Sequence, residues 1–394
     1  MPAFEIRVSD KKGKSVFALS QIKSGSVIFE ESPLISSQFS WNAVYGYLAC
    51  EFCLRPLETA ECNVQRLSND YSINLPYLEC CHVQEGMSKH TNCPDCREMY
   101  CSEACQQSAL DSYHKALCLG ANRTDINHPI NALIEFWKKI HYPPETSSIM
   151  LVIKIIGMFK QSSDTQKLRT QFDQFFSQTE NQDLMIFHKM LGENFLQQIE
   201  QLYELICIAF DPSSDERLQW LTFPGFQSLL ALIGTNGQGI GTSSFADWVR
   251  NVSDISLSEK QRESLDELID HLYSKLDEVV GSFLNNEGSA LYSTQSKINH
   301  SCVPNAECRF PYSNHHLQLT AICDIEPGQE ICISYLDECA LERSRHSRQK
   351  ILAENYLFQC QCEKCENQTN DPDETSDEEE EDDLIDEGRI DDSD

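Results

Sequence analysis

Basic side chains are scarce in this sequence. Its 394 residues include 31 Lys and Arg against 62 Asp and Glu, a net charge of −31 at pH 7. Residues 371–394 hold 15 acidic residues and one Arg, so this tail carries −14 and the remaining body carries −17. A surface of this sign repels phosphate groups, which argues against nucleic acid as the main partner and favours basic proteins.

Long apolar runs are also missing. The most apolar stretch, residues 149–159, is short and interrupted by Lys154, whereas a helix that spans a bilayer needs roughly 20 apolar residues. Residues 1–7 contain no continuous apolar segment of the kind found in secretory signals. We therefore expect no membrane segment and an intracellular protein, in the cytoplasm, the nucleus or both.

Cysteine, in contrast, is abundant, with 19 residues. Disulfides are the alternative for a secreted chain, but the missing signal favours reduced thiols, many of them metal ligands. Short spacings let one turn present two of the four ligands that zinc takes. Four ordered pairs have such spacings and predict two zinc sites: Cys50 and Cys53, Cys93 and Cys96, Cys101 and Cys105, and His114 and Cys118.

The apolar pattern divides the chain and indicates an α+β fold. Strand patterns occupy residues 4–41 and 290–336, helical spacing dominates residues 129–234, and a charged helix is expected at 340–355. Two stripes at helical spacing predict core-facing helices, with a partner-binding groove as the alternative. They comprise Phe195, Ile199, Leu202, Ile206 and Phe210, and then Leu265, Leu268, Ile269, Leu272, Leu276, Val279 and Phe283.

Two motifs connect this pattern to a known family. The sequence Asn299-His300-Ser301-Cys302, a weak glycosylation match by itself, precedes the strand-like residues 330–335 and the triplet Cys360-x-Cys362-x-x-Cys365. This order resembles the core of SET-type protein methyltransferases. The residues from Tyr100 to Cys118 resemble a MYND zinc finger. Residues 4–366 together resemble the SET and MYND domain-containing lysine methyltransferases.

The resemblance implies a SET-type β fold that is divided by insertions. The expected segments are the first part of the SET domain at 1–46, a MYND-type finger with a long insert at 47–120, a helical insert at 121–285 that includes a glycine-rich loop at 234–242, the catalytic core at 286–339, a post-SET zinc segment at 340–366, and a disordered acidic tail at 367–394.

The same resemblance assigns a site for S-adenosylmethionine and for the substrate lysine. Tyr335 would lie at the inner end of the lysine channel, and Tyr356 would close the channel beside the cofactor. Both are the expected catalytic residues. Ser15 stands where the pattern usually has a second glycine. The expected cofactor-binding residues are Lys12, Gly13, Lys14, Asn236, Asn299, His300, Tyr335 and Tyr356.

The resemblance also implies three zinc ions per chain. In a MYND finger the ligand pairs interleave, so one zinc would be held by Cys50, Cys53, Cys101 and Cys105, and the second by Cys93, Cys96, His114 and Cys118. The post-SET zinc would be held by Cys302, Cys360, Cys362 and Cys365. The long insert adds residues that we interpret as spare groups, with a further ligand set as the alternative: Cys62, Cys80, Cys81, His82 and His90.

The implied function is S-adenosylmethionine-dependent methylation of lysine in basic proteins such as histones or ribosomal proteins. The implied partners are a basic protein substrate and a peptide at the finger, with the chain a monomer. One alternative is a zinc-finger adaptor with a weak or silent SET domain. Another is a zinc-dependent nucleic-acid binder, for which residues 343–350 form the only basic cluster. We interpret this cluster as a solvated helix face.

Overall fold

Strands from the two ends of the SET-like part pair with each other. The computed structural model describes residues 3–9, 12–81, 90–141, 148–281 and 284–372. β1 (Phe4–Ser9) and β2 (Gly13–Ala18) form a hairpin, and Gly13 has a φ of +64°, a left-handed conformation that glycine adopts without strain. β2 pairs with β14 (Glu330–Ile333), and β14 pairs with β11 (Asn299–His300). The resulting sheet has the order β1-β2-β14-β11 and brings the segment with Gly13 and Lys14 close to the segment with Asn299 and His300.

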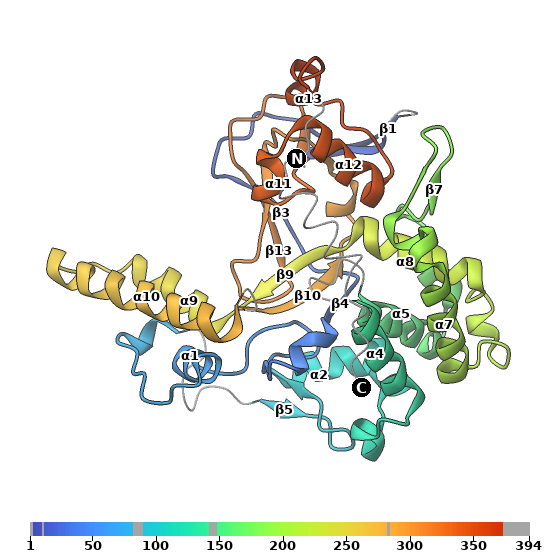
Figure 1. Cartoon of the computed structure of the whole chain (residues 1–394), viewed down its shortest axis with the longest axis horizontal. Helices are drawn as coiled ribbons and strands as arrows, with labels where there is room; N and C mark the ends of the chain where they lie inside the picture. Colours follow the sequence, from blue (N-terminus) through green and yellow to red (C-terminus); the bar gives the residue numbers. More distant parts are fainter. Residues whose placement is uncertain (1–2, 10–11, 82–89, 142–147, 282–283, 373–394) are drawn as a thin grey trace.

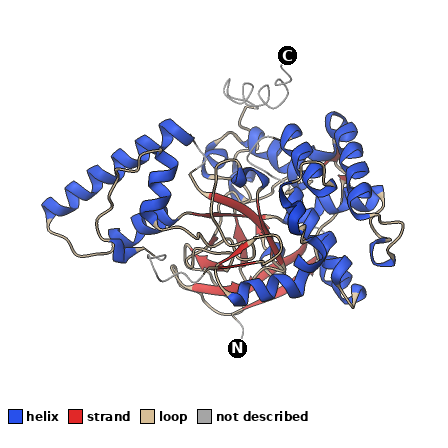
Figure 2. Ribbon diagram, turned by 90° about the horizontal axis from the view of Figure 1, so that it is seen from below, coloured by secondary structure: helices blue, strands red, loops and turns tan. Residues whose placement is uncertain are grey.

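Two three-stranded sheets complete the main β structure. One has the order β4 (Ile35–Gln38), β10 (Asn286–Leu291), β9 (Gln238–Thr242), and the other has the order β12 (Ala306–Arg309), β13 (Leu317–Ala321), β3 (Val27–Glu31). Alternating side chains from the sheets fill a common core, as the predicted strand pattern requires. Figure 2 shows the strands in the middle of the molecule, with helices on both sides.

The predicted glycine-rich loop at 234–242 is wrong. α8 (Phe223–Asn236) continues through Gly234, and β9 begins at Gln238. The glycines allow close packing, because a Cβ at Gly237 would lie 2.6 Å from the Ile233 carbonyl oxygen, and one at Gly234 would lie 2.7 Å from the ring of His188. Gly234 and Gly237 therefore mark tight contacts, whereas a Cβ at Gly239 would meet no atom within 4 Å.

A helical layer packs beside the sheets. It contains α4 (Pro129–Ile140), α5 (Ile149–Gln161), α6 (Thr165–Phe172), α7 (Glu193–Phe210) and α8, together with a hairpin of β7 (Glu180–Asn181) and β8 (Ile186–Phe187). The stripe on α7 faces the core as predicted, since Ile199, Leu202 and Ile206 are 2%, 1% and 0% exposed. Among the described helices, none is both long and apolar enough to span a bilayer.

Lys154, which interrupts the apolar run of α5, is buried and fully paired. Its Nζ lies 2.6 Å from Glu51 Oε1 and donates to the carbonyl oxygens of Glu51 and Ser36 at 2.8 and 3.1 Å. A buried charge is tolerated only with partners of this kind. The cation therefore ties α5 to β4 and to the start of the finger.

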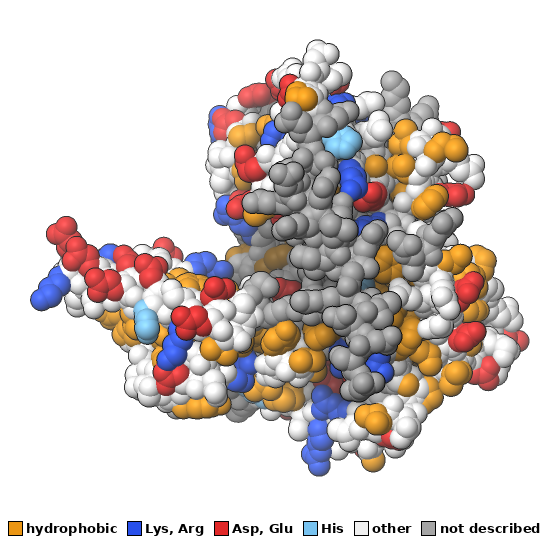
Figure 3. Space-filling view, in the orientation of Figure 1, with side chains coloured by type: hydrophobic (Ala, Val, Ile, Leu, Met, Phe, Trp, Pro, Cys, Tyr) orange, Lys and Arg blue, Asp and Glu red, His pale blue; other side chains and the backbone are white. Residues whose placement is uncertain are grey.

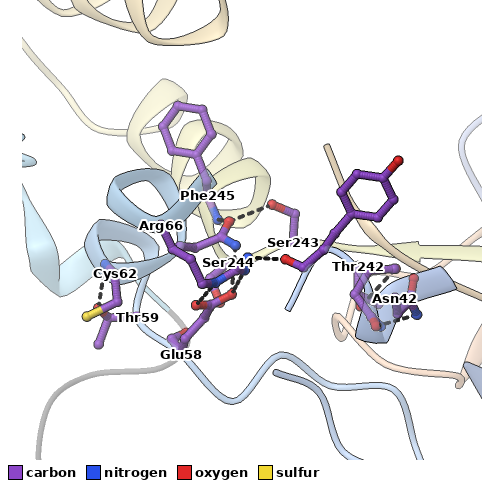
Figure 4. Close-up of polar contacts among 12 residues, drawn as sticks. Asn42, Glu58, Thr59, Cys62, Arg66, Thr242, Ser243, Ser244 and Phe245 are labelled. Carbon is purple, nitrogen blue, oxygen red and sulfur yellow. Dashed lines mark hydrogen bonds and ion pairs between the residues drawn. The ribbon is translucent and has the colours of Figure 1, made fainter. Parts of the chain in front are cut away.

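An arm of helices projects from the sheets (Figure 1). It is built from α1 (Ala60–Ser68), α9 (Ser244–Ser253) and α10 (Glu259–Val280), and the predicted stripe on α10 is buried at Leu265, Leu272 and Leu276. Figure 4 shows the base of the arm, where Arg66 pairs with Glu58 and the Ser244 hydroxyl donates to the Glu58 carbonyl oxygen at 2.6 Å. These contacts join the finger insert to the segment that follows β9.

The finger and the C-terminal segment have only short elements. The finger contains β5 (Thr91–Asn92), β6 (Met99–Tyr100), α2 (Glu103–Ala109), a π-helical turn (Leu110–His114) and α3 (Lys115–Leu117). The helix expected at 340–355 is two helices, α11 (Glu338–Glu342) and α12 (Arg345–Tyr356), because Ser344 caps the second through the Ser347 N–H. α13 (Glu363–Asn367) follows. Residues 373–394 of the predicted tail lie outside the described residues.

Candidate active site and metal centres

The first predicted ligand group comes together in the finger. The Sγ atoms of Cys50, Cys53, Cys101 and Cys105 all lie within 4.8 Å of one another. The Ser102 hydroxyl accepts a hydrogen bond from the Cys105 N–H at 3.2 Å and caps α2, which fixes the turn that presents Cys101 and Cys105. Tertiary structure thus brings together two pairs that are far apart in the sequence.

The second and third groups also match the prediction. Cys93, Cys96, His114 and Cys118 form one group, and Cys302, Cys360, Cys362 and Cys365 form the other, each within 4.8 Å. The Tyr100 hydroxyl lies 3.2 Å from His114 Nδ1, which leaves Nε2 facing Cys96 Sγ at 3.5 Å. A second contact that orients the ring in this way is typical of a metal-binding histidine.

The spacing of the ligand atoms fits tetrahedral zinc. Four sulfurs at 2.3 Å from a zinc ion lie about 3.8 Å apart, and a sulfur and a nitrogen lie about 3.6 Å apart. The Sγ–Sγ distances are 3.6 Å for Cys53–Cys101, 3.5 Å for Cys101–Cys105, 3.8 Å for Cys93–Cys118 and 3.6 Å for Cys302–Cys365. A disulfide would need about 2.05 Å, and all 19 cysteines are free thiols. The chain therefore has three four-ligand groups that could hold zinc.

Metal analysis of the purified protein should find three zinc ions per chain. The expectation follows from three complete ligand groups with zinc-like spacing. Inductively coupled plasma mass spectrometry, normalised to amino-acid analysis, gives the ratio directly. A ratio of one or zero, with no other divalent metal in compensation, would contradict the prediction.

Arg348 is fully buried beside the third group, so the basic cluster at 343–350 is not simply a solvated face. Its Nη2 donates to Gln368 Oε1 at 2.7 Å and lies 3.8 Å from Cys365 Sγ, while Arg345 Nε donates to the Cys365 carbonyl oxygen at 2.9 Å. Four thiolates around one zinc carry a net charge of −2, which a buried guanidinium offsets. Arg345 and Arg348 of the cluster therefore contact the third ligand group at Cys365.

The long insert supplies no further ligand group among the described residues. Cys62 is exposed, Cys80 is half-buried and Cys81 is buried, and neither these thiols nor His90 belong to a group of three or more ligands. His82 lies outside the described residues.

An aromatic cluster surrounds Tyr335. The ring of Tyr356 lies 4.8 Å from that of Tyr335, the ring of His300 lies 5.5 Å away, and Phe358 completes the cluster at 6.3 Å. The Tyr335 hydroxyl donates to the Ile298 carbonyl oxygen at 2.7 Å. Burial raises the pKa of Tyr335, and it raises the pKa of Tyr356 to about 12, so both phenols are neutral at physiological pH. Phe358 had no predicted role, although its position two residues after Tyr356 was visible in the sequence.

His300 links the third cysteine group to Tyr335. Its Nδ1 accepts a hydrogen bond from the Tyr335 N–H at 2.9 Å, and its Nε2 lies 3.3 Å from Cys302 Sγ. The side chain is 8% exposed. Both ring nitrogens of His300 thus have partners within the protein. The ring connects the backbone of Tyr335 to Cys302, a predicted zinc ligand.

Asn299 belongs to a polar network on the sheet. Its Nδ2 donates to Ser15 Oγ at 2.7 Å and to Glu330 Oε1 at 2.8 Å, and Lys12 Nζ lies 2.8 Å from Glu330 Oε2. The hydrogen bond from Lys12 to Glu330 raises the pKa of Lys12. Burial raises the pKa of Glu330, but the bonds from Asn299 and Lys12 outweigh it, and its net pKa is lowered. Glu330, which had no predicted role, is thus an anion that organises this network.

The remaining predicted cofactor-binding residues lie at different places. Lys14 Nζ donates to the Gln174 carbonyl oxygen at 2.7 Å. Asn236 ends α8, and its Nδ2 donates to the carbonyl oxygens of Phe176 and Leu232 at 2.7 and 2.8 Å. No described hydrogen bond joins Asn236 to Asn299. The structure places Lys12 and Asn299 in one network and His300, Tyr335 and Tyr356 in one cluster, and Asn299 and His300 are neighbours on β11. The side chains of Lys14 and Asn236 make their hydrogen bonds outside both groups.

Comparison with known proteins places this site in a defined class. The SET domain family model matches residues 13–336, which span the sheets, the finger and the helical layer. The class is thus a SET-domain protein whose domain is interrupted by insertions.

Individual relatives define the family more narrowly. The chain is 51% identical over 373 residues to the protein-lysine N-trimethyltransferase SMYD5 of Danio rerio, covering 95% of this chain and 89% of that protein. It is 53% identical over 375 residues to the protein of the same name from Gallus gallus, covering 95% and 88%. The chain belongs to the SMYD5 family of SET-domain protein-lysine methyltransferases. The resemblance predicted from the motifs, and from the long finger insert, is confirmed.

Proposed function

We propose that this chain transfers methyl groups from S-adenosylmethionine to lysine side chains of basic proteins, and that the aromatic cluster around Tyr335 forms the lysine channel. The observation that carries the proposal is the contact of Tyr335 with Tyr356, Phe358 and His300 next to the Asn299 network. A free lysine amine has a pKa near 10.4 and must lose its proton before it can attack. A half-buried aromatic lining disfavours the ammonium and favours the neutral amine.

The side-chain amide of Asn299 is the feature of these residues that fits S-adenosylmethionine. The Asn299 Nδ2 is fully used, whereas no described residue donates to its Oδ1, so an amide oxygen is open to a donor. Lys12, Gly13, Lys14, Asn236, Asn299, His300, Tyr335 and Tyr356 are the residues that we propose hold the cofactor. When bound, the cofactor would supply an electrophilic methyl group on a sulfonium.

The chain's own residues would orient the substrate. Because the Tyr335 hydroxyl proton is committed to Ile298, the phenol oxygen is left as an acceptor for a substrate N–H. The faces of Tyr356 and Phe358 suit the methylated ammonium that the transfer produces. Orientation of two reacting groups can contribute about 7–11 kcal/mol to a barrier, so a rigid channel is the main catalytic device.

Exposed acids on the arm support a basic substrate. α10 presents seven exposed acidic side chains: Glu259, Glu263, Asp266, Glu267, Asp270, Asp277 and Glu278. Figure 3 shows red acidic side chains gathered on the arm. Such a surface attracts lysine-rich segments and repels nucleic acid.

We also infer a peptide-binding role for the finger and a monomeric chain. An open depression lined by Pro94, Asp95, Leu119 and Ala121 lies beside the second ligand group and supports the first inference.

The free thiols suit a reducing compartment, which supports an intracellular location in the cytoplasm, the nucleus or both. We also propose the segments with the boundaries given from the sequence, apart from the loop at 234–242.

Methyl transfer into a cell lysate tests the proposed function. Purified protein with a labelled methyl donor should label basic proteins, and mass spectrometry should locate the label on lysine. Because the relatives are named protein-lysine N-trimethyltransferases, trimethyl-lysine is the expected product. The adaptor alternative predicts no label and no binding of S-adenosylhomocysteine. The nucleic-acid alternative predicts a salt-dependent gel shift by a chain that methylates nothing.

Deletion of residues 371–394 should raise KM for a basic protein at low salt and leave kcat unchanged. The segment carries −14 and would concentrate a lysine-rich substrate near the site. The difference should fade as the screening length falls to about 8–10 Å. The measurement is a series of KM values against ionic strength for both chains. Identical salt profiles would leave the tail with a solubilising role only.

A further inference from the structure

Ser15 is a buried residue at the position where the SET pattern usually has glycine. It lies on β2 and is 3% exposed. In the sheet order β2-β14-β11, the strand β14 lies between β2 and β11. The Asn299 amide on β11 reaches both Glu330 on β14 and Ser15 on β2, although Ser15 and Asn299 are 284 residues apart in the sequence.

The contacts allow only one orientation of the Asn299 amide. A primary amide nitrogen has two hydrogens, and here one goes to Ser15 Oγ at 2.7 Å and the other to Glu330 Oε1 at 2.8 Å. An ionised carboxylate only accepts, so a flipped amide would place its oxygen against the Glu330 oxygen. Lys12, at 2.8 Å from the second Glu330 oxygen, keeps the carboxylate ionised and in place.

The fixed amide directs its oxygen away from Ser15 and Glu330. This Oδ1 receives no hydrogen bond from any residue in the described part of the chain. We propose that Ser15 and Glu330 are positioning residues that hold the Asn299 amide so that its Oδ1 accepts a hydrogen bond from the ammonium group of S-adenosylmethionine. The inference rests on the proposed function and deepens it, because it gives a role to the residue that departs from the family pattern.

A double-mutant cycle tests the proposal through binding alone. Isothermal calorimetry with S-adenosylhomocysteine is applied to the full chain and to the variants Ser15→Ala, Asn299→Ala and the double variant. If Ser15 acts through Asn299, Ser15→Ala should weaken binding about fivefold or more when Asn299 is present. In the Asn299→Ala background, the same change should alter binding by less than about twofold, because contacting residues are not additive.

Ser37→Ala is the matched control. Ser37 is a fully buried strand serine on β4, and its hydroxyl has no partner among the described residues. This variant also loses one buried hydroxyl and should bind as the unmodified chain does. In steady-state assays, Ser15→Ala should raise KM for S-adenosylmethionine more than it lowers kcat. The ligand-free melting temperature of Ser15→Ala should be modestly lower than that of Ser37→Ala, because only Ser15 loses a hydrogen bond.

The possible outcomes distinguish failure of the proposed function from failure of the positioning role. If the unmodified chain does not bind S-adenosylhomocysteine, the proposed function itself fails. If it binds, but Ser15→Ala binds equally well, or the Ser15 and Asn299 effects simply add, the positioning role is overturned while the proposed function stands. Unchanged binding by Asn299→Ala would also overturn the positioning role.

Discussion

Replacing Tyr335 with Phe is expected to lower kcat by about a hundredfold or more, the usual size of a lost proton-handling or orienting contact. The Tyr335 hydroxyl donates its proton to the Ile298 carbonyl oxygen, so its own oxygen remains as an acceptor for the substrate amine. Without the oxygen, the substrate amine loses its acceptor while the ring stacking with Tyr356 is kept. Stopped assays with a basic protein substrate at saturating methyl donor measure the effect.

Tyr292→Phe is the matched control for this prediction. The Tyr292 hydroxyl also donates to a backbone carbonyl oxygen, that of His315, and the ring is fully buried in the same core as the sheets. Both variants should lose about 1 kcal/mol of folding free energy, but only the Tyr335 variant should lose activity. Near-normal turnover by Tyr335→Phe, or an equal loss in both variants, would show that another residue orients the amine.

Replacing Cys101 with Ala is expected to unfold the finger and to reduce the zinc content from three to two or fewer. Zinc contributes about 10–16 kcal/mol to the folding of isolated fingers, whereas whole domains are stable by only about 5–15 kcal/mol. The damage should also reach the sheets, because the Cys53 carbonyl oxygen accepts from the His315 N–H at 2.8 Å and Leu54 packs on Gly288 of β10. Limited proteolysis with mass spectrometry should show early cleavage within residues 47–120.

Cys62→Ala provides the comparison within the same segment. Cys62 is exposed, belongs to no ligand group, and follows the N-cap of α1. This variant should keep its zinc and its protease resistance. A Cys101→Ala chain that retains three zinc ions and resists the protease would mean that the first ligand group does not hold the finger.

The metal ligands were the most predictable feature of this chain. Short pairs such as Cys50 and Cys53 are set by local spacing, and the way the pairs interleave followed from the resemblance to a MYND finger. The strands were also predictable, because Leu317 and Leu319 alternate with polar residues in a half-buried sheet. Membership of the SET-domain class followed from the order of Asn299, His300 and Tyr335, and the comparisons confirm it.

The features that were missed depend on contacts between distant segments. The glycines at 234–241 predicted a loop, but Gly234 lies in α8, where the ring of His188 leaves no room for a Cβ. Arg348 looked solvated in its helix, and only the fold places it beside Cys365. The role of Glu330 depends on partners from other strands, and the position of Phe358 near Tyr356 does not by itself show that its ring packs on Tyr335. Spacing along one segment cannot reveal contacts of this kind.

The pairing of the first strands with the last ones has a consequence for how the chain is made. Lys12 and Glu330, which join the two ends of the sheet, are 318 residues apart in the sequence. Synthesis proceeds at about 5–20 residues per second, so β2 is made tens of seconds before β14. During this time, the edge of β2 that pairs with β14 has no partner strand. An unpaired edge of this kind invites association with other chains. Premature termination before β14 should therefore produce aggregates, and a chaperone that shields the nascent N-terminal hairpin should raise the yield of active protein.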